Sequence, residues 1–177
     1  MHPGLRRAAT PVCVIPAAIS DPKAVDHVGG TRLIIGRAGD SGGELEFHSP
    51  RRLDDTEGRI VALEIAVSGF NLRASTRVKF TWNVAEGTGD GDRLVAFFKD
   101  MAGSVAGNLP WEGQKTFESG EGDLSLRATC SQMGLVLLKC TLCRPFVEDW
   151  SASVTVKLEA GTLDEVAARL GGFLQAV

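Results

Sequence analysis

The sequence lacks the features that mark several large classes of protein. Its 19 basic and 22 acidic residues give a net charge of −3 and form no block of like charge. Nucleic-acid binders gain much of their affinity from clustered Lys and Arg, so this balance disfavours a nucleic-acid partner. No apolar run approaches the ~20 residues that a membrane-spanning helix requires. We therefore expect neither a nucleic-acid partner nor a membrane partner.

Catalytic and metal-binding motifs are also missing. None of the three histidines has a Ser, Cys or Asp partner in a recognisable local motif. Cys140 and Cys143 have the C-x-x-C spacing of zinc and redox sites, but they fall in a predicted strand, where positions i and i+3 face opposite ways. We expect no catalytic residue, metal, cofactor or disulfide. Free cysteines fit a reducing, cytoplasmic location.

Length and composition indicate one domain behind a tail. Residues 1–29 contain four prolines and no period of 2 or 3.6, so a flexible tail is predicted there. Arg6 and Arg7 precede an apolar stretch, but prolines interrupt it, which disfavours a secretory signal. Residues 30–177 contain the regular patterns and are expected to form a single domain. A domain of about 150 residues buries roughly two-thirds of the surface that its unfolded chain exposes, so it needs no disulfide or metal ion for stability.

Alternation of apolar and polar residues predicts antiparallel strands over most of this domain. The predicted strands are 31–36, 44–48, 59–67, 74–82, 123–130, 135–143 and 150–159. The glycine-rich stretch 36–43 and the polar stretch 49–58 are predicted to be loops. In the hairpin 123–143, a five-residue loop with Gly134 at positive φ keeps the apolar residues together. This register places Leu126 opposite Cys140 and Leu124 opposite Leu142.

Two segments have the spacing of helices. The first has a face formed by Leu94, Phe97, Phe98 and Met101. It is predicted to run about three turns, with Asp90 or Asp92 as its N-cap and an end marked by Gly103 and Gly107. In the second, Thr162 and Glu165 form a capping box ahead of an apolar stripe: Val166, Leu170, Phe173, Leu174 and Val177. Strands followed by a helix, twice over, predict an α+β domain in which an antiparallel sheet carries two packed helices. The order also suggests a β-β-β-α duplication.

The stretch from Trp111 to Glu121 is the leading candidate for a binding site. Trp111 lies in a predicted loop, where amphipathic aromatics are common interface anchors. Negative charge surrounds it, because Glu112, Glu118 and Glu121 are opposed within the stretch by Lys115 alone. We predict that this segment faces a basic protein partner. The alternative interpretation is that Trp111 and Phe117 cover the open end of the sheet while the glutamates solvate the loop.

The order of residues from Trp111 to Leu126, continuing through Gly134 and Trp150 to the closing L-E-A-G-T-L segment, resembles an uncharacterised bacterial family of unknown function. That family carries W-x-G-E-x-x-W-x-S-x-E-G-D-L, followed by a hairpin, a strand with Trp and a final helix. Gln114 and Phe117 depart from the pattern, as does V-A-G-N-L-P at 105–110. The resemblance covers residues 31–177. More distantly, the layout is similar to small immunity proteins that neutralise toxins.

Taken together, these features favour a non-catalytic, cytoplasmic protein-binding domain of the immunity type. Such a domain would neutralise a toxin by occluding it. The alternatives are a binding module for another protein or a small ligand and, less favoured, an enzyme.

Overall fold

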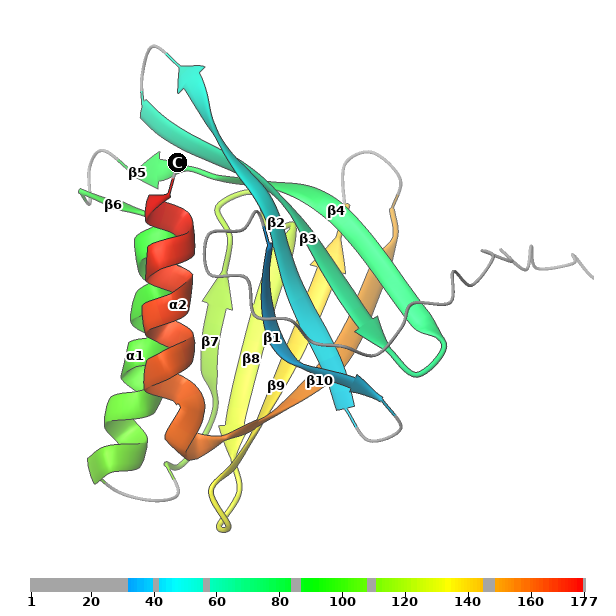
Figure 1. Ribbon diagram of the computed structural model, residues 1–177, viewed down its shortest axis with the longest axis vertical. Helices are drawn as coiled ribbons and strands as arrows, with labels where there is room; N and C mark the ends of the chain where they lie inside the picture. The colour runs from blue at the N-terminus through cyan, green and yellow to red at the C-terminus, as the bar shows by residue number, and fades with distance from the viewer. Residues whose placement is uncertain are drawn as a thin grey trace, which may run out of the picture.

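Two four-stranded antiparallel sheets and two α-helices make up the fold, which confirms the α+β class (Figure 1). The computed structural model describes residues 32–39, 42–55, 58–83, 87–107, 111–144 and 149–176. The predicted tail, 1–29, lies outside these residues. Within them, no helix is long and apolar enough to cross a membrane.

The elements fall into two groups along the chain. The first group contains β1 (Arg32–Gly39), β2 (Gly42–Asp55), β3 (Gly58–Gly69), β4 (Leu72–Phe80), the short strands β5 (Trp82–Asn83) and β6 (Thr88–Gly89), and helix α1 (Asp90–Gly107). The second contains β7 (Lys115–Glu118), β8 (Leu124–Cys130), β9 (Leu135–Cys143), β10 (Ser151–Glu159), the 3₁₀ turn Ala160–Thr162 and helix α2 (Leu163–Gln175). The first sheet has the order β1-β2-β3-β4, and the second sheet has the order β10-β9-β8-β7.

Each group is a four-stranded meander followed by a helix, so the repeated unit is longer than the suggested β-β-β-α. The prediction missed β6 and β7, whose two and four residues are too few to show a clear alternation. The strands also form two sheets rather than one. Helix α1 packs beside β7, and α2 packs beside β1, so each helix lies against the first strand of the other group. This exchange supports a duplicated topology.

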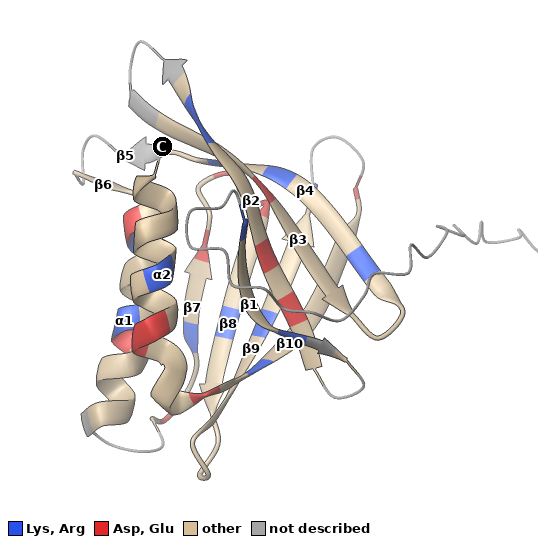
Figure 2. Ribbon diagram, in the orientation of Figure 1, with Lys and Arg blue, Asp and Glu red and all other residues tan. Residues whose placement is uncertain are grey.

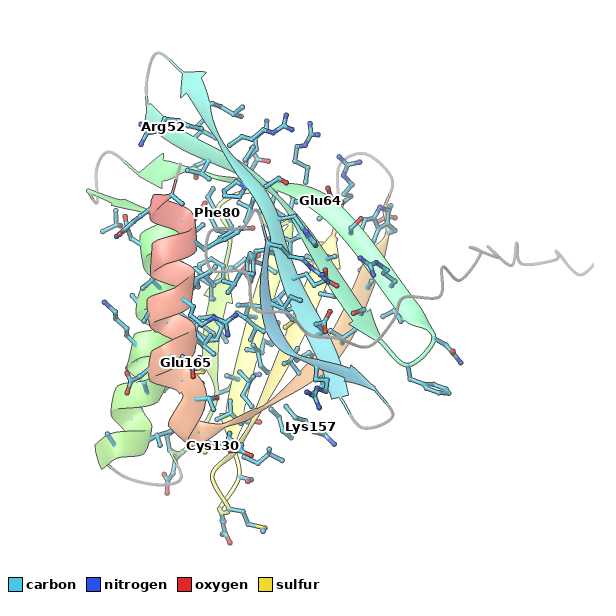
Figure 3. The ribbon with its side chains drawn as sticks, viewed as in Figure 1. Arg52, Glu64, Phe80, Cys130, Lys157 and Glu165 are labelled. Carbon is cyan, nitrogen blue, oxygen red and sulfur yellow. The ribbon has the colours of Figure 1, made fainter. Side chains whose placement is uncertain are left out.

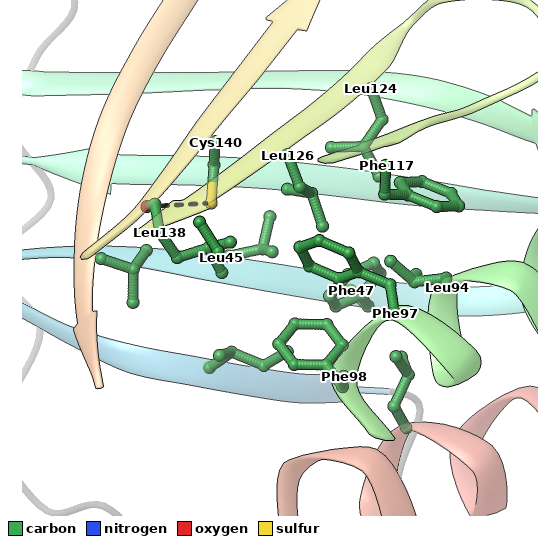
Figure 4. Packing of buried hydrophobic residues seen from close by; sticks show 14 of the residues in the cluster. Leu45, Phe47, Leu94, Phe97, Phe98, Phe117, Leu124, Leu126, Leu138 and Cys140 are labelled. Carbon is green, nitrogen blue, oxygen red and sulfur yellow. Dashed lines mark hydrogen bonds between the residues drawn. The ribbon is translucent and has the colours of Figure 1, made fainter. Parts of the chain in front are cut away.

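The core lies between the inner faces of the two sheets, and the helices close it along one side (Figures 1 and 4). Phe47 of β2, Leu126 of β8 and Phe98 of α1 are all fully buried there. Full burial of such a side chain stabilises the fold by about 1.5–3 kcal/mol. The predicted face of α1 is confirmed, because the described structure buries all four of its members: Leu94, Phe97, Phe98 and Met101.

The predicted register of the β8–β9 hairpin is confirmed. Leu126 pairs with Cys140 and Leu124 pairs with Leu142, while Gly134 adopts φ +74° in the loop. Helix α1, by contrast, is 18 residues long and continues through Gly103. A helical glycine costs about 1 kcal/mol relative to alanine, which the buried aromatic and Met side chains on the opposite face offset.

The two stretches predicted as loops are largely strand. At 36–43 the glycines permit the close approach of β10: a Cβ on Gly36 would lie 2.2 Å from Val156 Cγ1, and one on Gly43 would lie 2.9 Å from Val154 Cβ. At 49–58, β2 continues to Asp55 through an irregularity between His48 and Arg51. The glycines of the first stretch therefore reflect the packing of β10 rather than a loop. In the second stretch, the break in the strand pattern reflects a β-bulge rather than a loop.

The predicted capping box of α2 is not formed. Thr162 already has helical dihedral angles within the 3₁₀ turn, and its hydroxyl donates a hydrogen bond to the Glu159 carbonyl oxygen at 2.8 Å. The apolar stripe is present: Leu170 and Phe173 are buried, while Val166 and Leu174 are partly buried. Val177 lies outside the described residues.

Candidate protein-binding site

The segment predicted to bind a partner lies at the free edge of the second sheet, along β7 and its flanking turns, next to α1. Trp111 precedes β7 and packs against the hydrophobic core with its ring partly buried. Its indole Nε1 is buried without a hydrogen-bond partner. Lys115 Nζ lies 5.8 Å from the centre of the ring and forms an ion pair with Asp100 of α1. Trp111 and Lys115 are therefore held largely by the fold itself.

The glutamates of the segment are exposed. Glu112 and Glu118 are open to solvent, and the Glu121 carboxylate lies 3.9 Å from Lys79 Nζ. Burial raises the pKa of Asp123, and the negative charge of Glu121 raises it further, against the opposing effect of Arg144 and Lys79. Carboxylates thus crowd the β7–β8 connection. We call Glu118, Glu121 and Asp123 the acidic turn.

The same carboxylates also affect the pKa of the free thiol of Cys143. Burial raises the pKa of Cys143, and the charges of Asp123 and Glu118 add to the shift. The Cys143 thiol donates a hydrogen bond to the Gly122 carbonyl oxygen at 2.9 Å, while the Cys140 side chain is buried in the core. The two cysteines of C-x-x-C therefore face opposite ways, as strand alternation predicts. Among the described residues, no group of three or more His, Cys, Asp or Glu is arranged to hold a metal ion.

Asp90, at the start of α1, fixes the acidic turn in place. Its Oδ2 accepts hydrogen bonds from the Thr81 amide (3.0 Å), the Thr81 hydroxyl (3.1 Å) and the Gly120 amide (3.1 Å), and its Oδ1 accepts one from Arg93 (3.0 Å). A Cβ on Gly120 would lie 2.8 Å from Thr81 Oγ1, so this contact requires glycine. The sequence suggested Asp90 only as a helix cap. No local signal marks a partner 30 residues away.

The family comparison agrees with a fold that occupies most of the chain. Residues 37–177 match a family of unknown function, DUF6228. The chain belongs to this family. The expected membership in an uncharacterised family is therefore confirmed, and the matched range includes the candidate segment. The comparison with curated proteins gives no match.

A groove of about 620 Å³ lies between α1, α2 and neighbouring residues of the first sheet. Phe80 and Val61 give it apolar walls, and Arg52 and Lys99 are the cations among its lining residues (Figure 3). Its volume is within the range of small-ligand sites, roughly 300–1,000 Å³. Asp90 also borders the groove, but its hydrogen bonds are directed to the protein. The sequence gave no indication of this groove, because its lining comes from segments far apart in the chain.

A buried carboxylate on the outer face of the first sheet was also missed by the sequence analysis. Glu46 is 1% exposed, and its Oε2 accepts hydrogen bonds from Arg32 Nε (3.0 Å) and Nη2 (2.7 Å). His48 Nε2 lies 2.8 Å from the same oxygen, and Arg73 Nη2 lies 3.7 Å from Oε1. We call these four residues the Glu46 cluster. Glu46 occupies a polar position of an alternating strand, and such a position is ordinarily solvated.

Proposed function

We propose that the protein is a non-catalytic protein-binding domain of the immunity type, which neutralises a toxin in the cytoplasm by occluding it. The acidic turn is the observation that carries this proposal. Its carboxylates crowd together at a sheet edge although their mutual repulsion is unfavourable, and Lys79 and Arg144 offset that repulsion only in part. Such a surface attracts a basic partner and accelerates the encounter.

The rigidity of the turn supports the same proposal. Asp90 ties the Gly120 amide to the start of α1, and Ser119 Oγ accepts a hydrogen bond from the Leu124 amide at 3.1 Å. A partner therefore meets a turn whose backbone is already held in place, so little backbone entropy is lost on binding. In the described structure Cys130, Cys140 and Cys143 are free, which is compatible with a reducing compartment.

Capture of partners from the native cell, with the intact chain as bait, tests the proposal. We expect a basic protein to be retained, and we expect Glu118→Gln with Glu121→Gln to weaken its binding by about 10-fold or more, equivalent to about 1.4 kcal/mol. The matched control is Glu64→Gln with Glu165→Gln, which removes the same charge from exposed sites elsewhere (Figure 3). Equal binding by both double variants would contradict a role for the acidic turn.

Trp111 is the second residue to test. Because its ring is partly buried in the core cluster, we expect Trp111→Ala to lower the free energy of unfolding by about 2 kcal/mol, less than for a fully buried Trp. Trp111→Phe should retain most of the packing and remove the unpaired Nε1–H. Binding that is lost in the Ala variant and kept in the Phe variant would assign Trp111 a supporting role behind the contact surface.

The groove favours a second candidate function, the binding of a small ligand that has both apolar and polar groups. Its volume and apolar walls are suited to such a ligand. Substitution of a bulky side chain at Ala168, an exposed residue of α2 that lines the groove, should abolish binding of an apolar fluorescent probe while the fold is retained. Unchanged probe binding would remove this candidate.

A further inference from the structure

Three cations lie next to one another on the outer face of the second sheet. Arg127 of β8 is directly opposite Lys139 of β9, and Lys157 of β10 is opposite Leu137, one diagonal step from Lys139. All three side chains are exposed, and Figure 2 shows their strands marked in blue at neighbouring positions. We call Arg127, Lys139 and Lys157 the cation row.

No ion pair compensates the cation row among the residues that the structure describes. Like charges directly opposite each other on antiparallel strands are destabilising, because their Cβ atoms are only about 4.5–5.5 Å apart. The neighbouring outward positions carry hydroxyl groups or Leu137, which is 37% exposed, except at two borders: Glu118 lies one diagonal step from Arg127, and Glu159 lies two residues beyond Lys157. These hydroxyl-bearing neighbours are Thr116, Ser125, Thr129, Thr141, Ser153 and Thr155. The face therefore combines positive charge, hydrogen-bonding groups and one apolar side chain.

We propose that this face binds an acidic segment of another protein. Carboxylates of an extended segment can pair with the three cations, and Arg127 can hold one of them in a bidentate arrangement. Leu137 offers an apolar contact in the middle, and the hydroxyl groups can bond to a neighbouring main chain. The contact would relieve the repulsion between Arg127 and Lys139. This inference does not rest on the acidic turn, because it concerns the opposite charge, although Glu118 of the turn borders the face.

The composition and borders of the face distinguish a protein segment from other anions. The outward positions of β8–β10 carry Ser, Thr, Leu, Cys and charged residues, so bases of single-stranded nucleic acid would find no aromatic ring on which to stack. Glu118 lies on the outward side at one border and Glu159 at another, so the positive region is confined to the three cations and matches a short acidic segment better than a long polyanion. Anionic membranes are recognised by clusters of about four to eight Lys or Arg, more than this face offers.

The test uses the full chain and a fluorescent short peptide of alternating Glu and Ser, with a Gln-for-Glu peptide as the uncharged reference. The patch variant combines Arg127→Gln, Lys139→Gln and Lys157→Gln. The control variant combines Arg37→Gln, Arg77→Gln and Arg169→Gln, which removes the same charge from exposed positions elsewhere. We expect the wild type and the control to bind the Glu peptide with affinities within about 2-fold, and the patch variant to bind at least about 10-fold more weakly.

Several results would overturn the inference. These are equal losses in the two triple variants, an affinity of the wild type for the Gln peptide that matches its affinity for the Glu peptide, or no binding of the Glu peptide by the wild type. Stronger patch-dependent binding of a single-stranded DNA oligonucleotide or of phosphatidylserine vesicles would assign the face to those partners instead. A thermal melt of each variant accompanies the binding data. The patch variant should melt no lower than the wild type, because it removes a like-charge contact.

Discussion

The cations on the outer faces of the two sheets differ in whether they are paired with a carboxylate. On the first sheet, the buried Glu46 carboxylate gathers Arg32, His48 and Arg73 around it. On the second sheet, the cation row has no acidic partner among the described residues, and two of its members face each other directly. The sheets have the same number of strands and the same antiparallel order, so topology does not impose this difference. Charge pairing on a sheet face is therefore set residue by residue, and the unpaired face is the one for which we propose a partner.

The largest effect is expected from removing the charge at the centre of the paired face. Glu46→Gln keeps the volume of the side chain but removes the buried carboxylate that Arg32 and His48 contact. Breaking a buried ion pair costs about 3–5 kcal/mol, and since Arg32 is half exposed we expect a loss of about 2–3 kcal/mol in the free energy of unfolding. Urea denaturation measures it. A loss below about 0.5 kcal/mol would mean that the cluster adds nothing beyond ordinary surface pairing.

The same substitution should alter the dependence of stability on pH. Burial alone would raise the pKa of Glu46, but hydrogen bonds with Glu44 and Arg32 and the charges of Arg32 and Arg73 outweigh it and hold the pKa below its usual value. A lowered pKa in the folded state means that this stabilisation is present above the usual carboxyl pKa and is lost as pH falls through the folded value. Wild type should therefore lose stability on acidification more steeply than Glu46→Gln. Parallel curves for the two proteins would contradict this.

Two charge reversals, one on the outer face of each sheet, should change the stability of the protein in opposite directions. Lys139→Glu places a carboxylate between Arg127 and Lys157, and we expect a gain of about 0.5–1 kcal/mol. Arg77→Glu on the first sheet places a second carboxylate opposite Glu64, and we expect a loss of similar size. Thermal melts of both variants at low salt provide the comparison. If both changes destabilise the protein equally, the cation row carries no repulsion to relieve.

The smallest effect is expected at the margin of the Glu46 cluster. Arg73 is 67% exposed, and its Nη2 lies 3.7 Å from Glu46 Oε1, so Arg73→Ala should cost less than about 0.5 kcal/mol. Arg32→Ala should cost more, because Arg32 makes two hydrogen bonds to the buried carboxylate. Equal costs at the two positions would indicate long-range charge, rather than hydrogen bonding, as the source of stability in the cluster.

Local pattern was sufficient where the neighbour in space is also near in sequence. The register of β8 with β9 followed from keeping Leu124, Leu126, Cys140 and Leu142 on one face, and the buried face of α1 followed from a period of 3.6. The candidate segment could be named from its charges, but not the partial burial of Trp111 or the ion pair of Lys115 with Asp100. Those depend on α1 lying beside β7, which no local signal specifies.

The sequence by itself determined the α+β class, most strands, the inner face of each and the two helices, because alternation and helical spacing follow from backbone geometry. Only the tertiary structure decided that the strands divide into two sheets, that Gly36 and Gly43 admit β10, and that Asp90 holds Gly120 in place. It also decided which cations are paired, since Glu46 and Arg127 occupy equally polar positions of their strands. Burial and cross-strand pairing depend on residues that are distant in the sequence and close in space. A pattern of neighbouring residues along the chain therefore does not predict them.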